Sequence, residues 1–132
     1  MEYNNISDES INWNHARYTL EKLSDVVMIL VTGEGDARSR LRESIPQIQD
    51  VIPCTFPTED MRERFNLAIA ALKKFHNPEE YAKRPSNSPE TIFDSTLTRI
   101  KNRTAAKIIG NLFSTWMELK ALYDQHTMDQ NN

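Results

Sequence analysis

The chain has 132 residues, of which 39% are hydrophobic and 27% are charged, a composition typical of one folded domain with a modest core. Its 16 basic and 19 acidic residues give a net charge of −3 at pH 7, which excludes a whole-protein attraction to nucleic acids or acidic membranes. Any anion-binding site must therefore be local.

The sequence carries no sign of export or membrane insertion. Its single cysteine, Cys54, excludes an internal disulfide. The N-terminus lacks the pattern of a signal peptide, and the longest apolar run, residues 26–31, is far shorter than the roughly 20 residues that span a bilayer. We therefore expect a cytoplasmic protein with no membrane association.

Glycine is too scarce for a β architecture. Only 3 glycines occur, and no Asn-Gly or Asp-Gly turn brackets an alternating run. The sequence predicts an all-α fold, a compact bundle of four to five helices. We expect one domain over residues 1–132, with an ordered core over residues 8–126 and frayed ends.

The first predicted helix covers residues 10–32, where apolar side chains recur at a three-four spacing. Gly33 follows at the position of a left-handed C-cap. The apolar stripe consists of Trp13, Ala16, Leu20, Leu23, Val27 and Leu30.

Asp36 is a candidate N-cap for a second helix. Pro46 is expected to kink this helix or to end its regular part near residues 43–44. Residues 50–57 form a predicted connector. The inward side of the helix consists of Ala37, Leu41, Ile45 and Ile48.

Thr58 is the predicted N-cap of a third helix, with acidic residues in its first turn. Residues 77–87 follow as a predicted loop, with one helical turn at residues 78–82. The inward residues of the third helix are Met61, Phe65, Ala68, Leu72 and Phe75.

Ser88 and Pro89 predict another helix start, and residues 89–125 are helix-compatible throughout. One unbroken helix would measure about 55 Å against about 35 Å for the first helix, and would overhang a compact bundle. We therefore predict a break or bend near residues 101–104, with Gly110 as the alternative position.

No pattern in the sequence indicates catalysis or metal binding. The histidines, His15, His76 and His126, lack a Glu three positions earlier, and one cysteine cannot build a zinc site. The segment from Gly33 to Asp36 joins two predicted helices and is not a nucleotide-binding loop. We expect no catalytic residue, cofactor or metal, and the sequence favours a protein without enzymatic activity over an enzyme.

Two basic clusters are the candidate contacts for a partner or an anion. Arg99, Arg103 and Lys107 are spaced by four residues and would form one stripe on a helix, and Arg38 and Arg42 would share a face of another. The alternative is a solvated surface whose charges pair with Asp94 or another helix. The two clusters would form one positive patch if their helices were adjacent.

Apolar residues exceed what one buried stripe requires. Met28 widens the stripe of the first helix, and Phe113, Trp116 and Met117 occupy more than one face of the last. Such a surplus indicates either a helix buried on two sides or a surface that meets another protein.

The sequence favours a non-catalytic protein that acts through protein–protein interaction, as an accessory or regulatory subunit. Self-association into a homodimer is the simplest form of this hypothesis. The alternative is a nucleic-acid-binding component that uses the local arginines and lysine. An enzyme with scattered active-site residues is a third alternative, and a deep pocket with converging polar groups would indicate it.

Overall fold

The computed structural model describes residues 10–131. It confirms the all-α bundle, and the described residues contain no strand. Four long helices and two short ones are present in these residues, against the four to five helices expected. The long helices are α1 (Trp13–Thr32), α2 (Ala37–Gln49), α3 (Glu59–Leu72) and α6 (Asn102–Gln130), and the short elements are η3 (Pro53–Thr55), α4 (Pro78–Ala82) and α5 (Asp94–Arg99).

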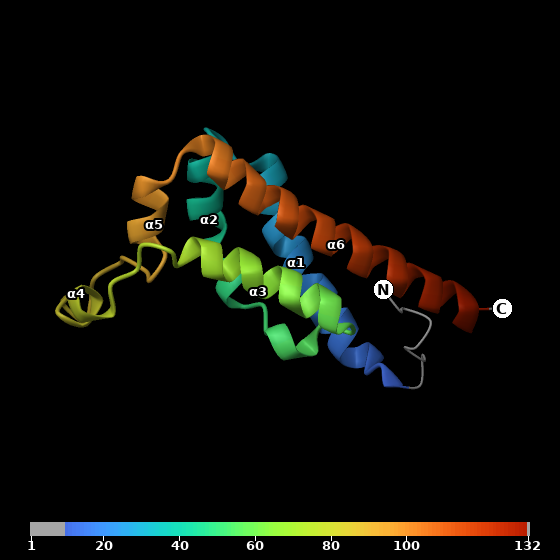
Figure 1. The fold of residues 1–132 in the computed structure, drawn as a ribbon. Coiled ribbons are helices and arrows are strands. Elements are labelled where there is room, and N and C mark those ends of the chain that lie inside the picture. The colour runs from blue at the N-terminus through green and yellow to red at the C-terminus, as the bar shows by residue number, and fades with distance from the viewer. Residues whose placement is uncertain (1–9, 132) are drawn as a thin grey trace.

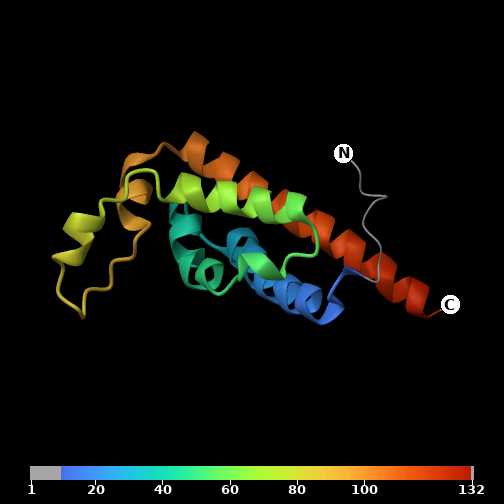
Figure 2. The ribbon, with the colours of Figure 1, turned by 60° about the horizontal axis from the view of Figure 1, so that its bottom comes forward.

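Helix α6 is the central element of the bundle. It packs against α1, α2 and α3, and α1 also packs against α2 (Figure 1). Helix α4 projects from the end of the bundle where α5 lies, as both views show (Figures 1 and 2). The core side chains come from all four long helices, and those with no exposed area include Leu23, Leu41, Leu72, Leu112 and Leu119.

Helix α1 begins at Trp13, three residues later than predicted, because the Asn12 side chain accepts a hydrogen bond from the backbone N–H of His15 at 3.1 Å. The prediction of a left-handed cap at Gly33 is wrong, since Gly33 is extended with φ −65°. A Cβ at Gly33 would lie 2.7 Å from the carbonyl oxygen of Ile29. Gly35, with φ 89°, makes the left-handed turn instead.

Helix α2 confirms the Asp36 cap, whose carboxylate accepts from the backbone N–H of Ser39 at 2.9 Å. The expectation that Pro46 ends the regular helix is wrong, because the helix continues to Gln49. Ile45 and Ile48, on either side of Pro46, are only 2% and 1% exposed. Their burial holds the last turn in place despite the hydrogen bond that proline cannot make.

Helix α3 begins after Thr58, whose hydroxyl accepts from the backbone N–H of Met61 at 3.2 Å. Four of the five predicted inward residues are buried, the exception being Phe75, which lies beyond the helix end and is 36% exposed. The predicted turn at residues 78–82 is α4.

The helix start predicted at Ser88 and Pro89 is wrong, because the next helix begins at Asp94. The Thr91 hydroxyl accepts from the backbone N–H of Phe93, and the Asp94 carboxylate accepts from that of Thr91. These hydrogen bonds fix the turn that precedes α5, whose N-cap residue, Phe93, forms no side-chain capping hydrogen bond. The burial of Phe93, Thr96 and Leu97 favours a helix start at this later position.

The predicted break in the last segment is confirmed. Ile100 and Lys101 are extended, with ψ 154° and 158°, and separate α5 from α6. Helix α6 then passes through Gly110 without interruption, so the alternative position was wrong. Its 29 residues measure about 44 Å, against about 30 Å for α1, and its C-terminal end extends past α1 (Figure 1).

The far end of α6 is still attached to the bundle by an aromatic contact. The imidazole of His126 stacks on the indole of Trp13, with ring centroids 3.7 Å apart. The helix continues to Gln130, beyond the limit expected for the ordered core. The expected fraying of the N-terminal residues lies outside the described residues.

Candidate functional site

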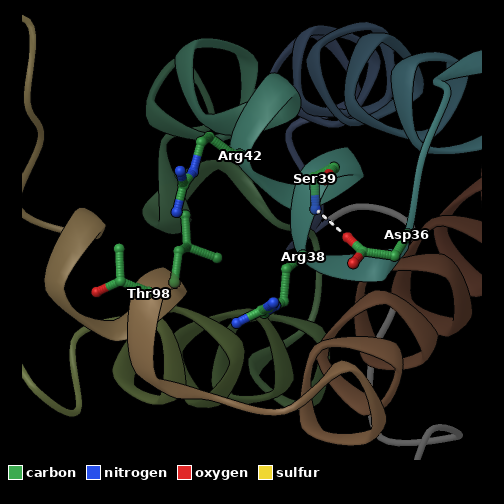
Figure 3. A pocket seen from close by; sticks show the side chains of 6 residues that line it. Asp36, Arg38, Ser39, Arg42 and Thr98 are labelled. Atoms are coloured by element: carbon green, nitrogen blue, oxygen red, sulfur yellow. Dashed lines mark hydrogen bonds between the residues drawn. The ribbon is translucent and has the colours of Figure 1, made fainter.

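Arg38 and Arg42 lie one turn apart on α2 and line the same hollow, whose volume is about 370 Å³. We call it the α2–α5 hollow. Its other lining residues are Asp36, Ser39, Leu97 and Thr98, so that α2 forms one wall and α5 the other. Figure 3 shows both arginine side chains extending from α2 into the space that faces Thr98.

Arg38 fixes α2 to the junction between α5 and α6. Its guanidinium donates to the carbonyl oxygen of Ile100 at 3.3 Å, and its backbone N–H donates to the side-chain oxygen of Asn102 at 3.2 Å. The first basic cluster therefore lies against the segment that connects Arg99 to Arg103.

Asp36 is the one acidic residue that lines the α2–α5 hollow. One carboxylate oxygen accepts from the backbone N–H of Ser39, and the other accepts from the Asn102 amide at 3.1 Å. The hydrogen bond from the Ser39 backbone lowers the pKa of this carboxyl most, with further contributions from the side chains of Ser39 and Asn102 and from the charge of Arg38. Asp36 is therefore ionised at neutral pH, and both of its oxygens are engaged.

The second basic cluster does not form the single stripe that its spacing predicted. Arg99 belongs to α5, whereas Arg103 and Lys107 follow the break and belong to α6. The guanidinium carbon of Arg99 lies 5.5 Å from the centre of the Phe75 ring. Arg103 and Lys107 are exposed and do not line the α2–α5 hollow.

None of the five candidate basic residues takes part in the ion pairs found among residues 10–131. Asp94, proposed from the sequence as a partner for these charges, accepts instead from the backbone N–H of Thr91. The five cations therefore carry their charge uncompensated by direct ion pairs in the described part of the chain.

A second feature is an exposed apolar surface along the seam between α1 and α6. Met28 and Val31 of α1 are each 62% exposed, and Phe113 and Met117 of α6 are 38% and 54% exposed. We call these four side chains the α1–α6 face. The sequence predicted a surplus of apolar residues on both helices, but it did not predict that the two helices pack side by side.

The seam itself brings these side chains together. The indole N–H of Trp116 donates to the Ser24 hydroxyl at 2.8 Å, which joins α6 to α1. Met28 lies one turn after Ser24 on the same side of α1. The Phe113 ring lies 5.6 Å from the Trp116 ring. Met28 and Phe113 therefore border the seam, and Val31 and Met117 each follow them by one helical turn on α1 and α6.

The chemistry-bearing residues considered from the sequence remain apart in the structure. Cys54 is exposed and free, and the His76 ring contacts Tyr81 while His126 contacts Trp13. Within residues 10–131, no group of three His, Cys, Asp or Glu side chains could hold a metal ion. No helix in this range has the length and apolar character needed to cross a membrane.

Comparison of the chain with protein-family models, curated proteins and solved structures found no match.

Proposed function

We propose that this protein is a non-catalytic interaction protein that binds another protein chain through the α1–α6 face, as an accessory or regulatory subunit. The observation that carries the proposal is the exposure of Met28, Val31, Phe113 and Met117 along one seam. A second copy of the chain is the simplest partner.

Isolated apolar side chains on a protein surface are ordinary, but a contiguous group of large ones is typical of an interface. Methionine and phenylalanine are enriched at the cores of such interfaces. The half-buried rings and chains of Trp116 and Ile109 lie on the same side of α6 as Phe113. A partner that covers the seam would complete their burial.

The test replaces Met28 or Met117 with glutamate. Each side chain is more than half exposed, so the substitution leaves the core intact and places a charge in the proposed contact. Leu67→Glu is the matched control, since Leu67 is 68% exposed but belongs to α3. Light scattering over a range of protein concentrations measures the mass, and circular dichroism checks folding.

We expect the wild type and Leu67→Glu to associate equally, and Met28→Glu and Met117→Glu to weaken association at least about tenfold, since a buried unpaired charge costs several kcal/mol. If the wild type is a monomer, the same four proteins are used as bait in the native extract. A partner retained equally by all four, or no partner at all, contradicts the proposal.

A further inference from the structure

We propose that the α2–α5 hollow is a binding site for the phosphate group of a small molecule or for a free phosphate ion. The hollow belongs to α2 and α5, whereas the proposed protein contact lies on α1 and α6, so the inference does not depend on the proposed function. Three observations support the inference: the positive charge of the hollow, its size, and the hydrogen bonds that already occupy the carboxylate of Asp36.

The two guanidinium groups retain most of their hydrogen-bonding capacity. Each arginine has five N–H donors, and Arg38 spends one hydrogen bond on the carbonyl oxygen of Ile100. That bond holds Arg38 in place, because the carbonyl belongs to the residue that ends α5. Arg42 is exposed and forms no ion pair within residues 10–131.

The net charge of the lining favours an anion. Arg38 and Arg42 contribute two positive charges and Asp36 one negative charge, which leaves an excess of one positive charge. The carboxylate of Asp36 is directed to Ser39 and Asn102, so it does not neutralise the guanidinium of Arg42. An incoming anion can therefore pair with Arg42 and with the remaining donors of Arg38.

Phosphate matches this arrangement better than a carboxylate. Two guanidinium groups one turn apart can approach different oxygens of a tetrahedral phosphate, and arginine–phosphate pairs are commonly bidentate. A carboxylate offers two oxygens in one plane and suits a single guanidinium. The ionised phosphate also carries more negative charge than a carboxylate does.

The size of the hollow indicates a small molecule. Its volume of about 370 Å³ lies at the lower end of the roughly 300–1,000 Å³ range of ligand pockets. Leu97 and Thr98 supply an uncharged wall opposite the arginines, and the exposed Thr98 is its accessible part. A nucleic-acid backbone needs a longer row of cations on an open surface, and Arg103 and Lys107 do not line this hollow.

The experiment titrates phenyl phosphate, inorganic phosphate, phenol and a short single-stranded DNA into the full chain, followed by calorimetry and by amide chemical shifts. The test variant is Arg42→Gln, because the Arg42 side chain has no hydrogen bond or ion pair to lose within residues 10–131. The controls are Arg103→Gln and Lys107→Gln, which remove the same charge outside the hollow. Arg38→Gln is a second test variant, with its folding checked by circular dichroism.

We expect phenyl phosphate to bind and phenol not to bind, with shifts at Ser39, Arg42 and Thr98. Arg42→Gln should weaken binding about tenfold or more, as for the loss of a charge-assisted pair, while both controls stay within about twofold of the wild type. Inorganic phosphate binding as tightly as phenyl phosphate would identify the free ion as the ligand.

Two results would overturn the proposal. One is that the hollow shows no specificity, because phenyl phosphate binds no better than phenol or because its binding is weakened equally by Arg42→Gln and by the control variants. The other is a clear preference for the DNA with an affinity that falls steeply with salt and depends on Arg103 and Lys107 as well. That second result would assign the basic residues to nucleic-acid binding.

Discussion

Gly33 and Gly110 differ in the space that the fold leaves for a side chain. At Gly33 a Cβ would lie 2.7 Å from the carbonyl oxygen of Ile29, too close for any side chain. At Gly110, in the middle of α6, a Cβ would meet no atom within 4 Å. The first glycine is therefore required by the fold, whereas nothing in the bundle requires the second.

We expect Gly110→Ala to raise the free energy of unfolding by about 0.5–1 kcal/mol, because alanine loses less backbone entropy in a helix than glycine does. Gly33→Ala should lower the free energy of unfolding, since either the Ile29 carbonyl or the chain at residue 33 must move. Urea denaturation followed by circular dichroism measures both. Equal effects of the two substitutions would contradict the assignment of their environments.

The residue-level predictions from the sequence were right where the relevant contacts are local. Helical spacing alone identified Leu41, Ile45 and Ile48 as buried, because three-four periodicity fixes which side chains share a face. The same rule placed Arg38 and Arg42 together. Helical spacing could not predict that Leu97 and Thr98 form the opposite wall of the hollow, because only the packing of α5 on α2 brings them to it.

A buried hydroxyl pair illustrates the same limit. Thr19 of α1 and Thr55 of η3 are 0% and 8% exposed, and their side-chain oxygens are hydrogen-bonded to each other. Neither position has a sequence signal for burial beyond its helical phase, since threonine is common on surfaces. A contact between residues 36 positions apart depends on the tertiary fold.

At the scale of the element, the start of α2 combines a helix cap with a connection to α6. Asp36 caps α2 through the Ser39 amide and also accepts from Asn102 in the first turn of α6. Both hydrogen bonds favour the charged carboxylate, which is why its pKa is lowered in the folded protein. Ionisation of Asp36 therefore stabilises the fold.

We expect Asp36→Asn to lower stability near neutral pH, because asparagine can still cap the helix but carries no charge. A carboxyl with a lowered folded-state pKa stabilises fully above its unfolded value of about 3.9 and loses that effect as pH falls through the folded value. The difference between wild type and Asp36→Asn should therefore be constant above about pH 5 and shrink as the pH falls from there through the lowered folded-state pKa. Urea denaturation across this range measures it.

Asp50→Asn is the control for this substitution. It also removes one carboxylate from α2, but at the C-cap, where the helix dipole disfavours an anion. We expect no loss of stability for Asp50→Asn at neutral pH. A loss as large as that of Asp36→Asn would show that net charge, and not the cap, accounts for the effect.

The helix ends separate what the sequence could predict from what it could not. Thr58 and Asp36 were correctly predicted as caps, because each accepts from an amide three residues away. Ser88 offered an equally good signal, but α5 begins at Asp94, and its N-cap residue, Phe93, forms no side-chain capping hydrogen bond. A helix can therefore begin without a capping side chain where its first residues are buried, as Phe93, Thr96 and Leu97 are.

At the scale of the molecule, the fold depends on α6 more than on any other helix, because α6 contacts each of the other three long helices. Leu112, near its middle, is completely buried. The break at Ile100 and Lys101 could be predicted from length, since one straight helix would have left the bundle. The helices that α6 packs against could not be predicted, because an amphipathic stripe does not specify its partner.

We expect Leu112→Ala to lower the free energy of unfolding by about 2–5 kcal/mol, the usual range for a fully buried leucine. Leu67→Ala, at an exposed position of α3, should change it by less than about 0.5 kcal/mol. Fluorescence and circular dichroism should give the same midpoint for each protein if the helices unfold together. Separate midpoints would show that α6 dissociates before the rest unfolds.

The central position of α6 has a consequence during protein synthesis. Roughly 70 residues separate the end of α1 at Thr32 from the start of α6 at Asn102. At ~5–20 residues per second, ribosomes take about 3–14 s to make that stretch. Throughout this time the side of α1 that α6 will cover has no partner, and the corresponding sides of α2 and α3 are in the same position once those helices are made. A nascent chain paused before Asn102 should therefore bind chaperones and be sensitive to proteases, and one that includes α6 should be resistant.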